Sequence, residues 1–341
     1  GSKSIIKNLT VTGGTQIAPS STTNTLYAGG VVGSTNGRVE NVQTNFNISA
    51  SDASYYDVQS LYAGGICGKG NIVTNAKSSG KIGLAYANVQ WRIGNQGGIG
   101  GIVGRGGNIN KAQSDCVISV WGKNMTAVGG IVGEGLDCNV DNACFYGSLS
   151  IQQDIWYNPS AFLTACSGIV GRSDGSLSVS NCISAPSSYS VNVSAIYLAP
   201  IAGDSQSQSW TGSNNYYTLP PTASDNLGQV ITENKLRTGE PLEGFDSDIW
   251  EFKTNELPSI KNIGVGEATS ISNIENNYQT DFIINKNKIT FPNIKAKTRI
   301  EIYNLDGQKE YSGYINSNES ISLRKGVYVI KIEKTRIKIA I

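Results

Sequence analysis

Short apolar runs separated by polar, glycine-rich turns recur along the first two thirds of the chain. The most regular run reads Tyr-Ala-Gly-Gly-Val-Val-Gly in its first copy and ends on a glycine each time. The closing glycines are Gly33, Gly68, Gly104, Gly133 and Gly171, followed by Gly203 in a degraded copy. Successive copies are 35, 36, 29, 38 and 32 residues apart. Short apolar runs bounded by glycine predict strands, and a period of roughly 20–50 residues indicates a repeat architecture.

A second block follows each glycine-rich run after a short turn. It centres on a polar column that holds Asn8, Asn41, Asn75, Lys111, Asn142 and Asn181. A third apolar stretch comes next, such as Phe46–Ile48 or Cys116–Val120. Each repeat therefore predicts three short strands and two tight turns. Asparagine suits a turn because its side chain can bond the backbone or the next asparagine of a stack.

This pattern predicts an all-β chain whose main body, residues 1–218, is a parallel β-helix (solenoid) of about six turns. Units this short bury their apolar face only by stacking on their neighbours, at a spacing of about 4.8 Å. Fixed glycine columns suit a positive φ or a close approach of two backbones at a corner. A propeller or a set of antiparallel hairpins is the alternative, although about 34 residues is short for a four-stranded blade. Since the chain opens partway round a repeat, we expect the natural protein to continue upstream.

Residues 219–262 break the repeat. They predict one short helix with Thr232 as its N-cap and Gly239 after its last turn. Phe245 and Trp250 follow as core residues. A stacked array leaves an open strand edge at its end, so we expect this region to cap the solenoid there.

The remaining residues predict a linker and a second domain. Residues 263–280 are polar and rich in Gly, Ser and Asn, which is typical of a linker. Residues 281–341 alternate with period two on either side of Asp306–Gly307, a strong hairpin turn. They predict a small antiparallel β-sandwich.

The glycine-rich run and the asparagine column together resemble the GLUG motif of bacterial surface proteins and adhesins. The resemblance covers about residues 5–217 and implies a scaffold and display surface. The tail resembles the C-terminal sorting domain of type IX secretion substrates, through Ile302–Gln308, Lys325–Lys331 and the basic, apolar final strand. In that family the domain guides export and attachment to the cell surface. The resemblance implies a protein exported to the surface of a Gram-negative bacterium, or beyond it.

Composition excludes several kinds of chemistry. The chain has no histidine, so neither a His–Ser or His–Cys dyad nor histidine-bound zinc or iron can form. Charged residues make up 16% and the net charge is +1, which favours neither nucleic acid nor anionic lipid as a partner. No apolar run approaches the ~20 residues of a transmembrane segment. We expect a monomer without cofactor or metal, whose partners are glycans or surface proteins of the host or of bacteria.

The six cysteines predict core positions better than a disulfide framework. Cys67, Cys166 and Cys182 fall in apolar columns of the repeat, where a buried thiol acts as a small hydrophobe. Cys116 falls in a glycine column. Cys138 and Cys144 flank the turn of the fourth repeat and are the one local pair. Their spacing allows a disulfide as well as two free thiols.

Aromatic residues in the variable segments between repeats are the first candidate ligand-binding site. They are Tyr55, Tyr56, Trp91, Trp121, Trp156, Tyr157 and Trp210. Because they recur at a similar phase of the repeat, some of them can line one side of the solenoid, and aromatic rings bind the faces of sugars. Alternatively, they pack the variable segments onto the body.

An acidic cluster is the alternative site. It comprises Glu134, Asp137 and Asp141 in one turn and Asp174 in the next. Arg105 and Arg172 each follow a closing glycine and could share one face. Such a cluster could serve acid–base chemistry or hold calcium, but aspartate is also a common turn residue.

Three functions agree with these observations. We expect a non-enzymatic cell-surface adhesin or glycan-binding scaffold. A β-helix polysaccharide lyase or hydrolase is the alternative, and it requires at least two carboxylates that converge with Arg or Lys. The third hypothesis is a structural stalk for a domain that lies upstream.

Overall fold

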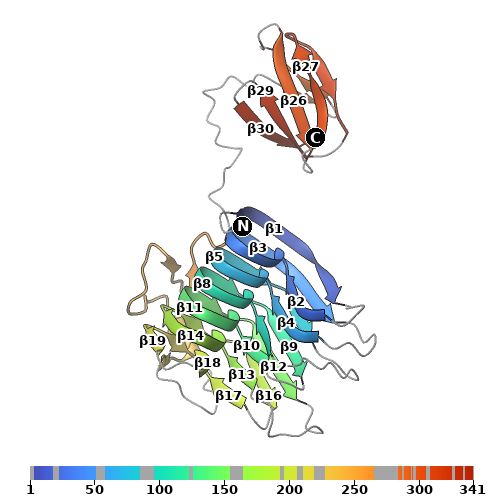
Figure 1. Ribbon diagram of the computed structural model, residues 1–341. Helices are drawn as coiled ribbons and strands as arrows, with labels where there is room; N and C mark the ends of the chain where they lie inside the picture. The colour runs from blue at the N-terminus through green and yellow to red at the C-terminus, as the bar shows by residue number, and fades with distance from the viewer. Residues whose placement is uncertain are drawn as a thin grey trace. The chain divides into compact units, whose positions relative to one another are not determined.

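The computed structural model describes most of the chain (Figure 1). The described residues are 4–17, 23–50, 58–84, 96–122, 126–153, 164–192, 196–205, 210–218, 227–264, 283–285, 288–292, 294, 297–304, 308–324, 327–332 and 335–340. The chain forms two compact units, residues 1–267 and residues 268–341. Within the described residues, no helix is both long and apolar enough to cross a lipid bilayer.

The first unit is a parallel β-solenoid, as the repeat predicts. One of its sheets has six strands in the order β17-β13-β10-β7-β4-β2, and each of them contains the start of one glycine-rich run. These strands are β2 (Thr23–Gly29), β4 (Val58–Gly64), β7 (Gln96–Gly100), β10 (Thr126–Gly129), β13 (Thr164–Ser167) and β17 (Ile196–Ala199). Equivalent residues of successive copies pair directly, so the repeat period in the sequence is one turn of the solenoid.

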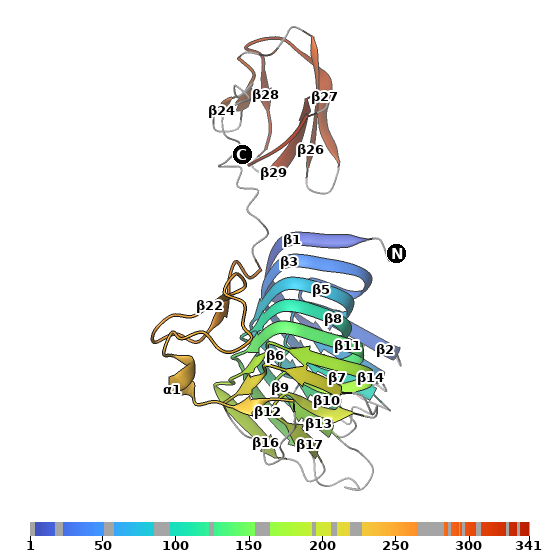
Figure 2. The ribbon, with the colours of Figure 1, turned by 90° about the vertical axis from the view of Figure 1, so that its left-hand side faces the viewer.

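A larger parallel sheet forms the other sides. Its long strands are β1 (Ile5–Ile17), β3 (Val32–Ala50), β5 (Cys67–Ser79), β8 (Val103–Ser114), β11 (Val132–Phe145) and β14 (Val170–Ser180). Its shorter strands are β6 (Lys81–Leu84), β9 (Val117–Gly122), β12 (Ser148–Gln153), β15 (Ile183–Ser184), β16 (Ser188–Asn192), β18 (Ala202–Ser205), β19 (Trp210–Ser213), β20 (Tyr216–Tyr217) and β21 (Gln229–Val230). The turns are stacked one on another (Figure 2). They make about four turns, and the predicted number of six is not confirmed.

Apolar columns fill the interior. Ile66, Ile102, Ile131, Ile169 and Ile201 occupy the same position of successive turns, and each is fully buried. Burial of each such side chain stabilises the fold by roughly 1.5–3 kcal/mol. Because these side chains contact mainly the turns before and after them, the stability of each turn depends on its neighbours.

Backbones approach closely at the glycine pair of each run. A β-carbon at Gly129 would lie 1.9 Å from the carbonyl oxygen of Val132 and 2.7 Å from the amide nitrogen of Gly171 in the next turn. Since Gly129 does not have a positive φ, close approach is what requires glycine here. The sequence had left both explanations open.

The asparagine column forms a second corner. Its residues have a left-handed backbone: Asn8 (φ 58°), Asn41 (53°), Asn75 (53°), Lys111 (54°), Asn142 (53°), Asn181 (53°) and Asn214 (53°). Asparagine tolerates this region better than most residues do. Its amides also bond along the stack, since Asn75 Nδ2 donates to Asn41 Oδ1 at 2.9 Å and Asn41 Nδ2 donates to Asn8 Oδ1 at 3.1 Å. The predicted role of this column is confirmed.

Lys111 interrupts the asparagine ladder, and a distant segment occupies the two positions beside the interruption. On one side, the backbone N–H of Gly264 donates to Asn75 Oδ1 at 3.2 Å. On the other, the indole N–H of Trp250 donates to Asn142 Oδ1 at 2.9 Å. Both acceptors would otherwise bond amides of a continuous ladder. The chain after the last turn therefore runs back along the asparagine corner.

This segment, residues 227–264, packs on the side of the solenoid (Figures 1 and 2). It contains β21, α1 (Glu233–Leu236), β22 (Trp250–Glu251) and β23 (Ser259–Ile260). Only β21 extends the last open edge, by parallel pairing with β20. The other elements bury Leu236, Phe245 and Trp250 against Cys144 and Ile183 of the solenoid. Most of the segment thus covers a side of the array, where the sequence suggested a cap over its end.

The predicted helix is confirmed. Thr232 is its N-cap, and the Thr232 hydroxyl accepts a hydrogen bond from the Lys235 backbone N–H at 3.2 Å. Arg237 is the C-cap, and Gly239 follows with a φ of 81°, the left-handed backbone that commonly follows a helix.

The second unit contains two antiparallel sheets. One comprises β24 (Ile283–Asn285), β25 (Lys288–Thr290) and β28 (Ser320–Ser322), and the other comprises β27 (Lys309–Ile315), β26 (Thr298–Asn304), β29 (Val327–Ile332) and β30 (Thr335–Ala340) in that order. Ile289 and Phe291 beside the first sheet share one core with Ile300, Ile302 and Ile330 of the second. This is the layering of a small sandwich. Asp306 and Gly307 lie outside the described residues, between the paired strands β26 and β27.

Replacing Gly129 with alanine tests the close approach of the turns. Because the added methyl would meet two backbone atoms, we expect Gly129→Ala to lower the free energy of unfolding by about 3 kcal/mol or more in urea denaturation. Gly83→Ala is the control, since its β-carbon would meet only the flexible end of Lys81, at 3.2 Å from Cε. We expect its effect to stay within about 0.5 kcal/mol. Equal losses would show that close approach is not the constraint.

Two tryptophan substitutions test the bond between the side segment and the ladder. Trp250→Phe leaves Asn142 Oδ1 buried without its donor, which costs about 1–3 kcal/mol beyond the lost ring volume. Trp210→Phe removes an indole N–H that is buried and has no hydrogen-bond partner. We therefore expect the smaller loss for Trp210→Phe in thermal and urea unfolding. The reverse order would contradict the assigned role of Trp250.

Candidate functional site

The variable segments all enter the six-stranded sheet at the same edge. They run from Ile17 to Thr23, from Ala50 to Val58, from Leu84 to Gln96, from Gly122 to Thr126, from Gln153 to Thr164 and from Asn192 to Ile196. Each joins one turn to the first strand of the next. Because those strands are parallel and paired in register, their starting ends lie side by side. The solenoid therefore presents six consecutive segments in one row.

Most of the aromatic candidates belong to this row. Tyr55, Tyr56, Trp91, Trp156 and Tyr157 fall inside the variable segments, outside the described residues. Trp121 is at the end of β9, where its backbone pairs with Gln152, next to the fourth segment. Six of the seven candidates are thus in or beside the connections at one edge, and their role in binding stays a prediction.

Trp210 is placed differently from the other candidates. It lies on β19 in the larger sheet and pairs with Leu177. Its ring is half-buried and packs against the solenoid core, with the indole N–H shielded from solvent. This difference could not be predicted from the sequence, because β19 is itself preceded by a variable segment.

Two carboxylates of the acidic cluster make structural contacts. Asp137 Oδ1 accepts hydrogen bonds from the backbone N–H and the hydroxyl of Ser176, both at 3.1 Å. Asp141 accepts from Ser180 Oγ at 2.9 Å and from Asn181 Nδ2 at 3.0 Å, and thereby continues the asparagine ladder. Both thus join one turn to the next.

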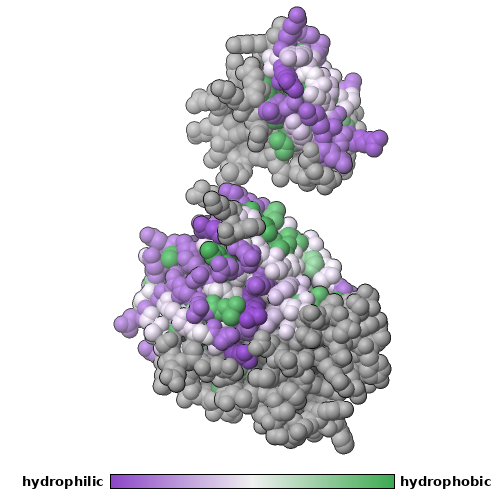
Figure 3. All heavy atoms as spheres, viewed as in Figure 1, coloured by the Kyte–Doolittle hydropathy of each residue, from purple (hydrophilic) through white to green (hydrophobic). Residues whose placement is uncertain are grey.

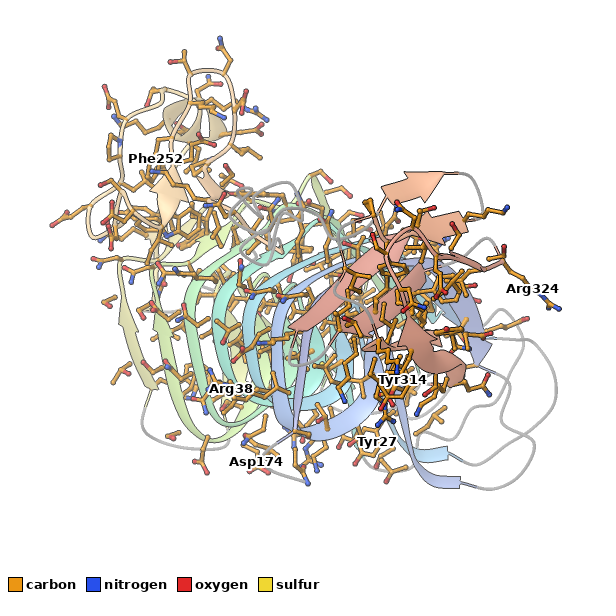
Figure 4. All side chains as sticks on the ribbon, turned by 90° about the horizontal axis from the view of Figure 1, so that it is seen from above. Tyr27, Arg38, Asp174, Phe252, Tyr314 and Arg324 are labelled. Atoms are coloured by element: carbon orange, nitrogen blue, oxygen red, sulfur yellow. The ribbon has the colours of Figure 1, made fainter. Side chains whose placement is uncertain are left out.

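The other two carboxylates differ in their exposure to solvent. Glu134 is 1% exposed, whereas Asp174 is exposed and lies at the outer edge of the solenoid (Figure 4). In the described part of the chain, no three carboxylate or thiol side chains are grouped so that they could hold a metal ion. Asp137 and Asp141 are thus engaged between turns, whereas the negative charge of Asp174 lies close enough to Glu134 to raise the pKa of the Glu134 carboxyl.

A charged column, which the sequence indicated only in part, surrounds Glu134. Lys69, Arg105, Glu134 and Arg172 are paired partners in successive turns, and each follows a closing glycine. The prediction that Arg105 and Arg172 share a face is confirmed by this register. Glu134 lies between them and joins the column, because it occupies the same position of its own turn.

The column is largely buried and only partly hydrogen-bonded. Arg105 Nε lies 3.1 Å from Glu134 Oε1, but neither atom makes a well-aligned hydrogen bond. Arg105 Nη1 donates to the Tyr62 hydroxyl at 3.1 Å, and its guanidinium lies 5.1 Å from the centre of the Tyr62 ring. The Tyr62 ring stacks on Tyr27 at 5.6 Å. Oppositely charged neighbours in successive turns let the stack bury these groups together.

Burial shifts the protonation of this column. It raises the pKa of the Glu134 carboxyl, and the positive charges of Arg105 and Arg172 oppose that shift. Burial and the nearby Glu134 raise the pKa of Tyr62 to about 12. Arg105 and Arg172 lie in the turns on either side of Glu134, an arrangement that is suited to join turns.

All six cysteines are free and buried. Cys67, Cys166 and Cys182 lie in the solenoid core, as their columns predict. The disulfide that the spacing of Cys138 and Cys144 allowed is absent. Burial raises the pKa of the Cys67, Cys138 and Cys166 thiols to about 12, so these groups stay protonated and unreactive at neutral pH.

Comparison with protein-family models, with curated proteins and with solved structures finds no match for this chain.

The stability profile with pH tests the state of Glu134. A carboxyl whose pKa is higher in the folded than in the unfolded protein stabilises the fold below its ordinary pKa, and this contribution is lost as pH rises through the raised value. Relative to Glu134→Gln, we therefore expect the native protein to lose stability as the pH rises above the ordinary pKa of a glutamate, measured as the difference in unfolding midpoint at each pH. A difference that instead grows with pH would show that attraction to Arg105 and Arg172 outweighs burial.

Proposed function

We propose that this protein is an exported, non-enzymatic surface scaffold of the GLUG-repeat type that binds glycans through its variable segments. The observation that carries the proposal is the single row in which these segments enter the six-stranded sheet. A rigid stack that presents six different segments along one edge suits the display of a binding surface. The apolar columns and the two corners are common to all turns, so sequence variation is concentrated where it leaves the stack intact.

Aromatic residues favour a glycan as the ligand. Trp91, Trp156 and Tyr157 belong to segments of the row, and Trp121 is next to it. Rings supply large contact area with little loss of conformational entropy, and they pack against the apolar faces of sugars. Rings from successive turns would follow the stacking direction, which suits a linear polysaccharide better than a single small ligand.

The proposal includes the finer features that the sequence suggested. These are six turns, of which the structure supports about four, and a sorting or anchoring role for the second unit. Two antiparallel sheets with a shared core support such a compact terminal domain. The expected location is the cell surface of a Gram-negative bacterium, with host or bacterial surface molecules as partners.

A glycan array, run in parallel with hydrolysis and lyase assays on the same polysaccharides, tests the proposal. We expect binding without turnover. Trp91→Ala and Trp156→Ala should each weaken binding at least about tenfold, which corresponds to the loss of 1.4 kcal/mol of contact energy. Tyr314→Ala is the matched control, because Tyr314 is 67% exposed on the second unit.

Two outcomes would contradict the proposal. One is turnover of a polysaccharide that Asp174→Asn abolishes while the thermal stability is unchanged, which would reveal an enzyme. The other is a loss of binding in the Tyr314→Ala variant equal to that of the tryptophan variants, which would move the binding surface to the second unit.

A further inference from the structure

The charge of the chain is divided unevenly between its two parts. Residues 281–341, which contain the strands of the second unit, have 12 Lys and Arg residues but only 6 Asp and Glu residues, a formal net charge of +6. Residues 1–280 have 15 and 20 of them, a net charge of −5. The overall value of +1 therefore conceals a basic part, which can attract partners that the whole chain does not favour.

One face of the four-stranded sheet of the second unit carries much of this positive charge. The isoleucines of β26 enter the core, whereas Arg299, Glu301 and Tyr303, which alternate with them, belong to the opposite face. The register places Lys309 of β27 opposite Tyr303 and Lys331 of β29 opposite Glu301. Hydrophilic residues extend along this side of the second unit in the space-filling view (Figure 3). We call this side of the sheet, with Arg299, Lys309 and Lys331, the basic face.

Glu301 draws the three cations of the basic face together. Its Oε1 lies 3.1 Å from both Arg299 Nη2 and Lys309 Nζ. Its Oε2 lies 3.3 Å from Lys331 Nζ and accepts a hydrogen bond from the Tyr303 hydroxyl at 2.9 Å. The hydrogen bond from Lys309, followed by those from Tyr303 and Lys331, lowers the pKa of the Glu301 carboxyl to about 2, so it is ionised at neutral pH. One carboxylate cannot neutralise three cations, and the cluster stays positive.

The three cations retain donors for a further partner. The side chains of Arg299, Lys309 and Lys331 are 61%, 43% and 40% exposed. A lysine ammonium has three donors and a guanidinium group has five, and Glu301 accepts one hydrogen bond from each of these side chains. The remaining donors lie at the surface, where they can bind an anionic group.

The positive charges form a two-dimensional array. Arg336 and Lys338 of β30 are opposite Lys331 and Val329 in the register, at positions of the same face. At about 4.8 Å between neighbouring strands, the basic positions on β27, β26, β29 and β30 extend roughly 14 Å across the sheet. A linear polyanion presents its charges along one line, whereas a membrane presents them in a plane. The array therefore matches a membrane surface better than a single polymer chain.

The aromatic residues of the basic face agree with this choice. Lys309 Nζ lies 5.6 Å from the centre of the Tyr303 ring, and the Tyr303 hydroxyl bonds Glu301, so this ring is not free to stack on a base or a sugar. Tyr314 is opposite Arg299 and is 67% exposed. Tyrosine is enriched at the interface between lipid headgroups and hydrocarbon, because its ring is apolar and its hydroxyl is polar.

We propose that the basic face docks the second unit on an anionic membrane surface, where Arg299, Lys309 and Lys331 bind lipid phosphates and Tyr314 lies at the level of the headgroups. The same surface repels residues 1–280 through their net charge of −5, which leaves the solenoid free to bind its own ligand. The proposal concerns the second unit alone, and it holds or fails independently of glycan binding by the variable segments.

Co-sedimentation of the full chain with lipid vesicles at low salt tests the proposal. We expect binding to phosphatidylcholine vesicles that contain about one third phosphatidylglycerol, and none to vesicles of phosphatidylcholine alone. Added salt should weaken the binding, since the Debye length falls to about 3 Å at 1 M. Each lysine near an anionic membrane strengthens binding about fivefold, so the double variant Lys309→Gln with Lys331→Gln should bind about 25-fold more weakly. Lys309→Gln alone should show the fivefold loss, and thermal unfolding checks that each variant is folded.

Two further variants separate membrane docking from a structural role of the cluster. The double variant Lys235→Gln with Lys253→Gln is the matched control, because it removes the same charge from the first unit, where both lysines are half-exposed and each is paired with one carboxylate. It should leave vesicle binding unchanged. Glu301→Gln removes the carboxylate of the cluster and should strengthen binding about fivefold, since it adds one positive charge to the face. A purely structural cluster would instead lose binding in this variant.

Four results would overturn the proposal. The first is equal binding to both kinds of vesicle, and the second is an equal loss of binding in the two double variants. The third is weaker vesicle binding by Glu301→Gln. The fourth is retention on heparin, a sulfated polysaccharide, that Lys309→Gln with Lys331→Gln abolishes, without binding of the native chain to either vesicle. That result would make an acidic polysaccharide the occupant of the basic face.

Discussion

The close approach of one turn to the next at the glycine corner is the constraint on which the rest of this structure depends. A β-carbon at Gly130 would lie 2.1 Å from the carbonyl oxygen of Gly168 in the next turn, so there is no space for any side chain at that position. The corner sets the distance between successive turns, and the residues of every other column are therefore stacked at the same distance. Apolar side chains of one turn then pack on apolar side chains of the next, and asparagine amides form hydrogen bonds between successive turns. Variation in length is confined to the segments that return to the six-stranded sheet, which is why those segments form a row.

The asparagine corner contains a local irregularity, and residues far away in the sequence form hydrogen bonds beside it. Lys111 can adopt the left-handed backbone of the corner but cannot continue the amide ladder. The segment after the last turn supplies donors on both sides of that gap, from Trp250 and from Gly264. Each amide of the ladder donates to the oxygen of the turn before, so Gly264 replaces the donor that Lys111 cannot supply to Asn75. Trp250 replaces the amide of Asn181, which donates to Asp141 instead of Asn142. The side segment therefore ties turns far apart in sequence, and its own small core of Leu236, Phe245 and Trp250 forms against the solenoid.

Much of this fold could be predicted from the sequence because each turn repeats the same local rule. The three strands per repeat, the asparagine corner and the core cysteines follow from columns that several copies share. The path of the side segment could not be predicted, since no local pattern connects Trp250 with Asn142, 108 residues earlier. The charged column was seen only in part. A charge after a closing glycine usually indicates a surface position, and only the register shows that Arg105, Glu134 and Arg172 compensate one another in a buried position. The aromatic candidates are in segments whose lengths differ, so no column fixes where their rings lie.

The two ends of the solenoid follow from the same rule that stacks its turns. A parallel stack has no intrinsic stop, because each turn offers the next the surface on which it rests itself. An end must therefore be built by departing from the repeat. Pro200 does so by removing a donor, and β21 does so by pairing with β20 before the chain turns away to the side. The end after the last glycine-rich copy is thus built from residues that depart from the repeat.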